Sequence, residues 1–241
     1  MQQSGKRPEP HFFWTIGTVI LNLVRRSQNH QFPALVLAAG AARRFGRPKA
    51  LLPLGSDRAS QQHAGNRTLL DAAIAQGRML SSDVRVLCGA WYPLIRFRGY
   101  RQPSAWLRVP EWHEGLSASL QAGLRSVGPQ ARGVFVLVAD QPLLDLNALA
   151  ALGEAARCFP DQPIAADYGD RPGVPAYLPR WLWPLVMDLE GDRGAGGLLA
   201  EVQATRVVIP GVHEDVDTPG DWLRVKALLS QTGRKARQSR R

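Results

Sequence analysis

The segment Leu37–Lys49 has residue types and spacing that suit a phosphate-binding loop. An apolar stretch leads into small residues, and two arginines, a glycine and a lysine follow. Small residues let backbone N–H groups approach a phosphate chain, and cationic side chains neutralise it. The segment does not match the Walker pattern, in which Gly-Lys-Ser/Thr opens a helix. A tight strand-to-loop turn with solvated bases explains the same composition, so both interpretations stay open on composition alone.

Two acidic residues stand beside predicted secondary-structure elements. Asp140 follows the apolar run Gly133–Ala139, and Asp217 lies just ahead of a predicted helix. A carboxylate at the end of a buried strand is costly unless it faces a cleft or a cation. Mg²⁺ is bound through one or two carboxylates together with substrate phosphates. The alternatives are a turn residue before Pro142 for Asp140 and a helix cap for Asp217. Combined with the phosphate loop, the two acids predict a Mg-nucleotide site.

The elements that must position these residues alternate between strands and helices. Strands are predicted over Ala34–Ala39, Asp83–Cys88, Gly133–Ala139 and Thr205–Ile209. Helices are predicted over Leu69–Leu80, within Gly115–Val127 after a short loop, over Asn147–Cys158 with Asn147 as N-cap, and over Pro219–Leu229. The polar segment Gly55–Arg67 is expected to be an exposed loop. Continuous apolar strands alternating with helices favour a mainly parallel sheet covered on both faces, in which ligands gather at the carboxyl ends of the strands.

Weaker signals lie in the glycine- and serine-rich segments. Ser117 and its neighbours are suited either to hydrogen-bonding a base or ribose, or to capping the following helix. The glycine-rich stretches Gly169–Pro175 and Gly191–Gly197 are loops that either line a substrate pocket or merely connect elements. The five histidines and two cysteines show no metal-ligand spacing.

The net charge of +10 over 241 residues first suggests a nucleic-acid-binding protein. Most of this charge lies at the two ends. Residues 1–31 hold four basic residues and one acid, and residues 230–241 hold five basic residues and no acid, so residues 32–229 are nearly balanced. Because the chain shows neither an aromatic-basic surface pattern nor a known nucleic-acid motif, we do not expect it to bind nucleic acid.

The chain therefore divides into three predicted parts. Residues 1–31 form an extension that is apolar and then basic, which we expect to be peripheral. Its apolar run, His11–Val24, is shorter than the about 20 residues that span a bilayer, and a poor cleavage site follows it. Residues 32–229 form one domain, and residues 230–241 a basic, disordered tail. Two cysteines are too few for a disulfide framework and fit a reducing compartment, so we predict a cytoplasmic protein.

Six segments together resemble one family. Leu37–Lys49 resembles the Leu-Ala-Ala-Gly-x-Ser-x-Arg-Met-Gly-x-x-Lys signature of the MobA-like NTP transferases. Trp112–Leu124 resembles the family's Trp-x-x-Gly-Met-x-x-Ser-Leu-x-x-Gly-Leu segment. The remaining matches follow in the family's order at Ala139–Pro142, Pro172–Leu178, Gly191–Leu199 and Asp215–Pro219. Within the family, the Ala-Ala-Gly and Asp-x-Asp-Thr forms resemble the molybdenum cofactor cytidylyltransferase type, whereas the guanylyltransferases typically show Ala-Gly-Gly.

The resemblance implies a three-layer α/β/α Rossmann-like nucleotidyltransferase fold over residues 32–229. It also implies transfer of a nucleoside monophosphate, CMP from CTP in the most similar type, to the phosphate of a molybdopterin-type cofactor, with Mg²⁺ as cofactor and pyrophosphate as product. The nucleotide-binding residues that it implies are Leu37, Ala38, Ala39, Gly40, Arg44, Gly46, Lys49, Ser119 and Asp140. Arg44, Lys49 and Asp140 would be catalytic, and Asp140 and Asp217 would hold Mg²⁺. A molybdoenzyme or its maturation chaperone is the implied protein partner.

Three departures from the family pattern leave alternatives open. Ala42 stands at the signature serine, Phe45 at the methionine, and Gly196 at a position that is usually arginine. A related enzyme that uses GTP, or a sugar or alcohol phosphate as acceptor, fits these changes. So does a non-catalytic protein that binds molybdenum cofactor during enzyme maturation. The retained acidic and basic residues of the predicted site favour the enzyme.

Overall fold

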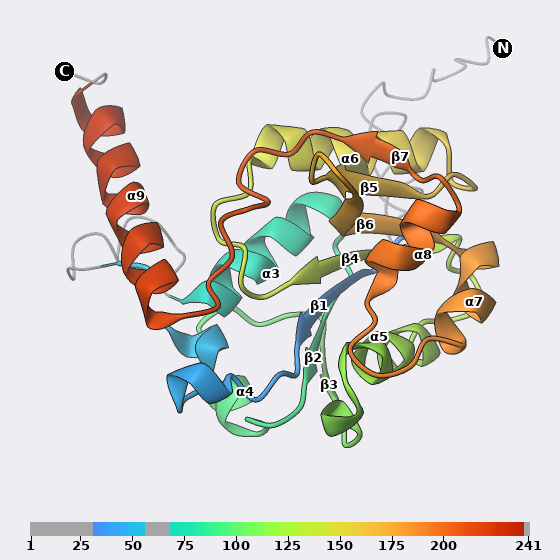
Figure 1. Cartoon of the computed structure of the whole chain (residues 1–241), viewed down its shortest axis with the longest axis horizontal. Coiled ribbons are helices and arrows are strands. Elements are labelled where there is room, and N and C mark those ends of the chain that lie inside the picture. Colours follow the sequence, from blue (N-terminus) through green and yellow to red (C-terminus); the bar gives the residue numbers. More distant parts are fainter. Residues whose placement is uncertain (1–30, 56–67, 239–241) are drawn as a thin grey trace, which may run out of the picture.

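The apolar run at Ala34–Ala38 forms an inner strand, β1, of a seven-stranded sheet in the computed structural model, which describes residues 31–55 and 68–238. The strand order is β3-β2-β1-β4-β6-β5-β7 (Figure 1). The other strands are β2 (Val84–Cys88), β3 (Ala105–Arg108), β4 (Gly133–Val138), β5 (Ile164–Asp167), β6 (Pro172–Pro179) and β7 (Thr205–Val207). Strand β6 runs antiparallel to β4 and β5, and the other neighbouring pairs are parallel.

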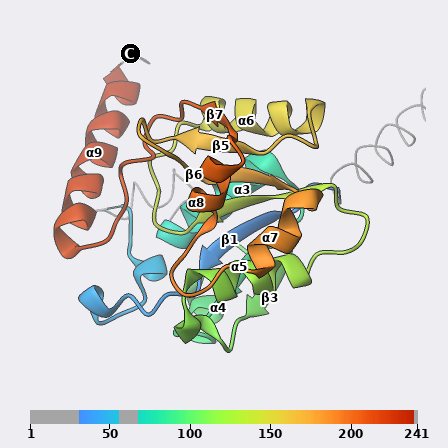
Figure 2. The same cartoon turned by 45° about the vertical axis from the view of Figure 1, so that its right-hand side comes forward.

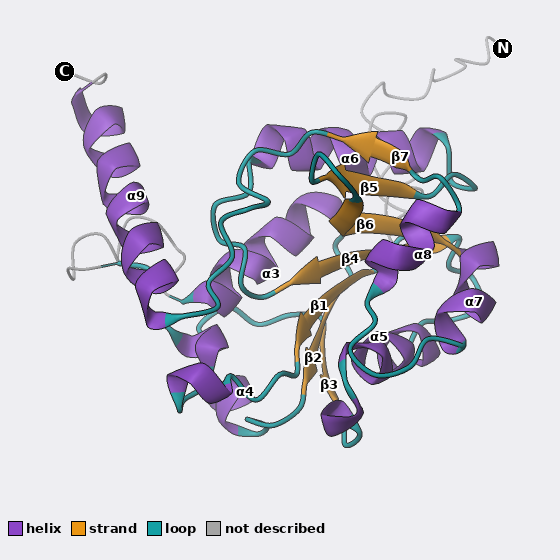
Figure 3. Cartoon of the chain, in the orientation of Figure 1, coloured by secondary structure: helices purple, strands orange, loops and turns teal. Residues whose placement is uncertain are grey.

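The strands are apolar throughout because both faces of the sheet are covered. Successive residues point to opposite faces, so Ala34 and Val36 of β1 join one hydrophobic cluster while Leu35 and Leu37 join another. The first cluster lies under helices α3 (Leu69–Leu80) and α6 (Leu146–Cys158). The second lies under α5 (Leu116–Arg125), α7 (Trp183–Met187) and α8 (Ala195–Glu201). The predicted three-layer α/β/α architecture with a mainly parallel sheet is confirmed (Figure 3).

The remaining helices lie around the edges of this sandwich. Helix α4 (Leu94–Arg98) follows β2, and the long α9 (Pro219–Gln238) stands beside the sheet in both views (Figures 1 and 2). A third hydrophobic cluster joins Val225 of α9 to Leu52 and Leu69. Four short 3₁₀ turns complete the described chain: η1 (Arg43–Phe45), η2 (Lys49–Leu51), η3 (Trp112–Glu114) and η4 (Arg180–Leu182). Helix α9 is thereby attached to the segment that follows the predicted phosphate loop.

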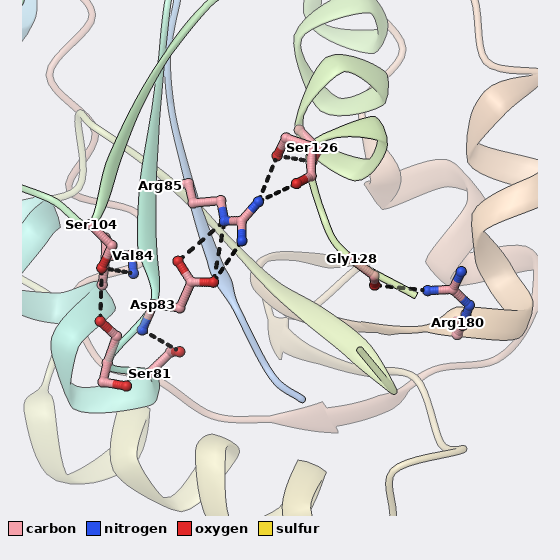
Figure 4. Close-up of polar contacts among 10 residues, drawn as sticks. Ser81, Asp83, Val84, Arg85, Ser104, Ser126, Gly128 and Arg180 are labelled. Atoms are coloured by element: carbon pink, nitrogen blue, oxygen red, sulfur yellow. Dashed lines mark hydrogen bonds and ion pairs between the residues drawn. The ribbon is translucent and has the colours of Figure 1, made fainter. Parts of the chain in front are cut away.

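Side chains connect the amino ends of β2 and β3 to their neighbours. Arg85 pairs with Asp83 at 2.8 Å and also donates to the carbonyl of Ser126 at the end of α5 (Figure 4). Ser104 accepts from the Val84 amide at 3.1 Å, which ties the start of β2 to the start of β3. These contacts lie at the end of the sheet opposite to Asp140. The carboxyl ends of β1 and β4 are therefore where a ligand site is expected.

The structure corrects several predicted boundaries. Helix α6 begins at Leu146, and Asp145 rather than Asn147 is its N-cap, because the Asp145 carboxylate accepts from the Ala148 amide at 2.8 Å. The predicted strand over 205–209 ends at Val207. Residues 172–175 belong to strand β6 and are not a loop, since their pairing with β5 outweighs a glycine- and proline-rich sequence. Helix α8 likewise begins inside the glycine-rich stretch 191–197.

The C-terminal prediction is also corrected. Helix α9 continues past residue 229 to Gln238, so residues 230–238 are not a disordered tail. Lysine, arginine, alanine and glutamine dominate this stretch, and all four favour a helix. The extension at 1–30, most of the Gly55–Arg67 loop and the last three residues lie outside the described chain. Among the described helices, none combines the length and the apolar character needed to cross a membrane.

Candidate active site

The carboxyl end of β1 is pressed closely against the segment that follows β2. The Ala90 amide donates to the carbonyl of Ala39 at 3.0 Å, and the indole nitrogen of Trp91 donates to the carbonyl of Ala41 at 2.7 Å. A Cβ atom added to Gly89 would lie 2.5 Å from the Ala39 oxygen, so only glycine permits this approach. The segment after β2 therefore holds the first residues of the predicted phosphate loop in place, directly after the end of β1.

The loop after β1 keeps its basic residues at the surface. Leu37 and Ala39 are buried, Ala38 is half-buried, and Gly40 is exposed, so the loop emerges at the predicted point. Arg44 is exposed and has no ion-pair partner within the described residues. Gly46 adopts a left-handed conformation (φ 60°), in which its amide donates back to the Arg43 carbonyl at 3.3 Å. The glycine therefore closes the η1 turn, as its residue type predicts.

Ala42, which stands at the position of the signature serine, has an unusual backbone conformation. Ala42 precedes η1 with φ 51° and ψ 45°, a left-handed conformation that residues other than glycine seldom adopt. The neighbouring Ala41 carbonyl is engaged by Trp91 at 2.7 Å. The fold therefore imposes this backbone path although no serine hydroxyl is present to support it.

Lys49 joins the two predicted metal-binding acids. Its Nζ lies 2.7 Å from Oδ2 of Asp140 and 3.0 Å from Oδ1 of Asp217. Lys49 lies in the η2 turn, Asp140 after the end of β4, and Asp217 in the loop before α9. Asp140 is 91 positions and Asp217 is 168 positions from Lys49 in the chain. The three residue roles predicted from separate segments thus meet at one place.

The electrostatics of this cluster are dominated by mutual attraction. Burial lowers the pKa of Lys49, but the carboxylates of Asp140 and Asp217 outweigh that effect, so the pKa lies above the usual 10.5. The ammonium group is consequently charged at neutral pH. A cation held between two carboxylates, close to a loop with exposed arginines, gives a site with both the acidic and the basic groups that a metal-bound phosphate chain needs.

The structure resolves the alternative for Asp217. Thr218, and not Asp217, caps α9: its hydroxyl oxygen accepts from the Asp221 amide at 3.2 Å, and the Asp221 carboxylate accepts from the Thr218 amide at 2.8 Å. This reciprocal pair is a capping box. The carboxylate of Asp217 is therefore available to Lys49. The Val216 amide also donates to the carbonyl of Asp140 at 3.0 Å, so the loop before α9 is fastened to the end of β4.

The serine-rich segment is placed differently from the acids. Ser119 is buried in α5, and the structure shows no contact between it and the Lys49 cluster in the described residues. Gly115, and not Ser117, is the N-cap of α5. The Ser117 hydroxyl instead donates to the carbonyl of Gly191 at 2.8 Å. This contact joins the start of α5 to the glycine-rich stretch 191–197. The role of Ser119 toward a base stays a prediction.

Several contributing residues have only weak signals in the sequence. Gln141, Tyr168 and Asp215 form hydrogen bonds around the end of β4, and Trp91 holds the loop after β1. Gln141 and Asp215 lie inside two of the segments that resemble the family, but nothing in those segments indicates that the two side chains form a hydrogen bond. Nothing in the sequence around Tyr168 or Trp91 distinguishes them from packing aromatics, because their partners are distant in the chain.

The donor set around Lys49 fits a hard divalent cation. Asp140 and Asp217 offer carboxylate oxygens, which Mg²⁺ and Mn²⁺ prefer. The described residues contain no group of three or more histidine, cysteine or acidic side chains with metal-binding geometry. Two carboxylates nevertheless suffice where substrate phosphates complete the coordination. The residues present therefore fit a divalent metal whose coordination a nucleotide completes.

The phosphate loop, the paired acids and the sheet around them agree with one known family. Its model, described as the MobA-like NTP transferase domain, matches residues 34–207. The chain belongs to the MobA-like NTP transferase family. It is a nucleotidyltransferase, and its mainly parallel sheet with helices on both faces is that of this enzyme class.

The matches to individual relatives of this transferase extend over nearly the whole length of each relative. Purine catabolism protein PucB of Bacillus subtilis (strain 168) is 28% identical over 209 residues, which are 80% of this chain and 95% of PucB. The crystal structure of Rv0371c from Mycobacterium tuberculosis H37Rv is 25% identical with a TM-score of 0.69, and covers 82% of this chain and 97% of its own. Rv0371c has also been solved in complex with manganese. A nucleotidyl transferase from Methanothermobacter thermautotroptrophicus (Mth528) is 19% identical with a TM-score of 0.66, and covers 84% and 99% of the two chains.

Proposed function

We propose that this transferase moves CMP from CTP to the phosphate of a molybdopterin-type cofactor and releases pyrophosphate. The observation that carries the site assignment is the convergence of Lys49 with Asp140 and Asp217 at 2.7 and 3.0 Å, at the carboxyl ends of the strands, where the phosphate loop begins. The choice of CTP and of the acceptor is supported by the Ala38-Ala39-Gly40 and Asp215–Thr218 segments, which resemble the cytidylyltransferase type.

The chemistry requires little acid or base catalysis from the protein. An oxygen of the acceptor phosphate attacks the α-phosphorus of the NTP, the bond from that phosphorus to the bridging oxygen breaks, and pyrophosphate leaves with its electron pair. The acceptor is already an anion at neutral pH, so the barrier comes from bringing two anions together and from charge on the leaving group. Arg44 and Lys49 reduce both, since they place positive charge along the phosphates.

A divalent cation held by Asp140 and Asp217 would supply further positive charge to the triphosphate. The manganese complex of Rv0371c supports a divalent cation in this family, and the oxygen-only donor set supports Mg²⁺ as the physiological ion. The backbone amides of the loop at Gly40 would hold the nucleotide in line with the acceptor. We propose that Asp140 is essential, because it lies at the end of a rigid strand and contacts Lys49 directly.

The acceptor side is where this chain departs from its family. Gly196 replaces the usual arginine, and a Cβ atom there would lie 3.3 Å from the carbonyl oxygen of Pro172, so the first turn of α8 lies against the start of β6. Strand β6 therefore borders the position at which acceptor recognition is expected to differ. A sugar or alcohol phosphate is the alternative acceptor that this substitution leaves open.

The function is tested by following pyrophosphate from purified protein, Mg²⁺, each NTP in turn and molybdopterin-type cofactor. We expect release with CTP. The Asp140→Asn variant should lose at least about 100-fold in kcat, the order of magnitude for removal of one preorganised electrostatic group. Asp161→Asn is the matched control, because Asp161 is a highly exposed acid that pairs only weakly with Arg132, at 3.7 Å.

The possible results separate the alternatives. Release with GTP but not CTP would contradict the cytidylyl assignment, and release with a sugar or alcohol phosphate but not with molybdopterin would contradict the acceptor. A protein that binds molybdenum cofactor but releases no pyrophosphate with any NTP would be a non-catalytic binding protein. A near-normal rate for Asp140→Asn would remove that residue from the proposed site.

A further inference from the structure

The side chain of Gln141 is the centre of a buried hydrogen-bond network beside the acidic pair. Only 3% of this residue is exposed. Its amide nitrogen lies 2.6 Å from the hydroxyl of Tyr168, 2.9 Å from Oδ1 of Asp215 and 3.0 Å from the carbonyl of Val212. Its own backbone carbonyl accepts from the amide nitrogen of Gln76 in α3 at 2.8 Å. One side chain therefore connects elements that are far apart in the sequence.

These partners lie immediately next to the residues that act on the nucleotide. Gln141 follows Asp140, and Asp215 is two residues ahead of Asp217. The Tyr168 hydroxyl donates to the carbonyl of Val174 at 2.6 Å, so toward Gln141 its oxygen is the acceptor. The amide thus fastens the loop before α9 to the end of β4 and to the turn between β5 and β6.

The orientation of the Gln141 amide is determined by its surroundings. The opposite orientation would place its oxygen against the Asp215 carboxylate and the Val212 carbonyl, both of which are acceptors. In the observed orientation Oε1 is buried without a hydrogen-bond partner in the described part of the chain. The network therefore joins the loops through the amide nitrogen of Gln141, while its Oε1 makes no hydrogen bond to the described residues.

We infer that Gln141 is a positioning residue that sets the distance and angle between the carboxylates of Asp140 and Asp217. Tyr168 and Asp215 hold its amide in place. The inference rests on the proposed function only in that these two carboxylates receive the metal and the nucleotide. Residues that orient metal ligands in this way commonly contribute about 10–100-fold in metal affinity or activity.

Two substitutions remove this support to different extents. Tyr168→Phe deletes one acceptor of the Gln141 amide and keeps the ring that packs against His213, whose centroid is 5.2 Å away. Gln141→Met deletes the amide itself. The matched control is Tyr177→Phe, which removes a buried hydroxyl that donates to the carbonyl of Pro160 at 2.8 Å, near Gly133 at the opposite end of the sheet.

Two quantities are measured at a temperature where circular dichroism shows every variant folded: the affinity for Mn²⁺ without nucleotide, and pyrophosphate release with the NTP that supports turnover. For Gln141→Met we expect Mn²⁺ affinity and kcat to fall by about 10–100-fold. For Tyr168→Phe we expect smaller losses in both, while the KM for the NTP stays within about twofold, because the phosphate loop is intact. Tyr177→Phe should retain wild-type values.

The inference is overturned if Tyr168→Phe and Tyr177→Phe have the same Mn²⁺ affinity and kcat, or if Gln141→Met matches the wild type. If Gln141→Met does not fold, the comparison of the two tyrosine variants decides. A wild-type protein that binds Mn²⁺ but releases no pyrophosphate contradicts the proposed function. The Mn²⁺ affinities of the variants would then still test the positioning of the carboxylates.

Discussion

Replacing Lys49 by methionine tests the charge balance of the site most directly. The lysine Nζ contacts Asp140 at 2.7 Å and Asp217 at 3.0 Å, and methionine preserves an unbranched side chain of similar length without the charge. The substitution leaves two carboxylates facing each other without a cation. We expect a less stable protein in the absence of metal, because the carboxylates then repel.

The size of this effect follows from the geometry. Both carboxylate oxygens touch one nitrogen, so they lie within about 6 Å of each other, and charges at that separation repel by about 3 kcal/mol at an effective dielectric constant of about 20. The Asp217 side chain is 56% exposed, so water screens part of this repulsion. A net loss of about 2 kcal/mol remains, which lowers the Tm of a chain of this length by about 4–8 °C.

The pH dependence has a definite sign. The pKa of Lys49 is raised above the usual 10.5 in the folded protein, so its contribution is fully present below that value and is lost as the pH rises through the folded pKa. The difference in Tm between wild type and variant should therefore be constant from pH 7 to pH 9. It should shrink only in more alkaline solution.

The assay is thermal unfolding of wild type, Lys49→Met and Lys226→Met, with and without Mn²⁺. Lys226 lies on α9 over the ring of Trp222 at 4.6 Å and has no carboxylate partner in the described chain, so it controls for loss of a lysine. Mn²⁺ should raise the Tm of Lys49→Met more than that of the wild type, since it replaces the missing cation. Equal Tm values and equal responses to Mn²⁺ in all three proteins would refute the reasoning.

Two further predictions concern the rest of the fold. Burial raises the pKa of the Cys88 thiol to about 12, whereas Cys158 is exposed. A thiol reagent at pH 8 should therefore modify Cys158 quickly and Cys88 only after denaturation. Rapid modification of both cysteines in the folded protein would contradict the burial of Cys88. Gly115→Ala should lower the Tm by several degrees, because the residue has φ +114° and the added Cβ would lie 2.3 Å from the carbonyl oxygen of Gly191. Gly128→Ala, whose added Cβ meets nothing within 4 Å, is the matched control, and equal Tm values for the two variants would show that the segments do not pack as described.

The accuracy of the sequence predictions followed the strength of the local signal. The helix predicted over Leu69–Leu80 from its apolar spacing matches α3 at both ends, because that spacing is a local signal; the structure adds a capping box between Thr68 and Asp71 at its start. Strand β4 was predicted to within one residue for the same reason. Strand β6 was missed, because two prolines and a glycine at its start give no strand pattern, and pairing with β4 and β5 stabilises it instead.

Sequence alone determined the kinds of residues that a nucleotide site needs and the order in which they occur. Small residues after an apolar strand, the basic residues that follow, and acids at element ends are local features of composition and spacing. Only the tertiary structure decided that Lys49 lies between Asp140 and Asp217. It also decided that Thr218 caps α9 and leaves the Asp217 carboxylate to Lys49, and that Gln141 connects the two acidic loops. Contacts between residues 91 and 168 positions apart depend on strand order and loop packing. No local pattern encodes either one.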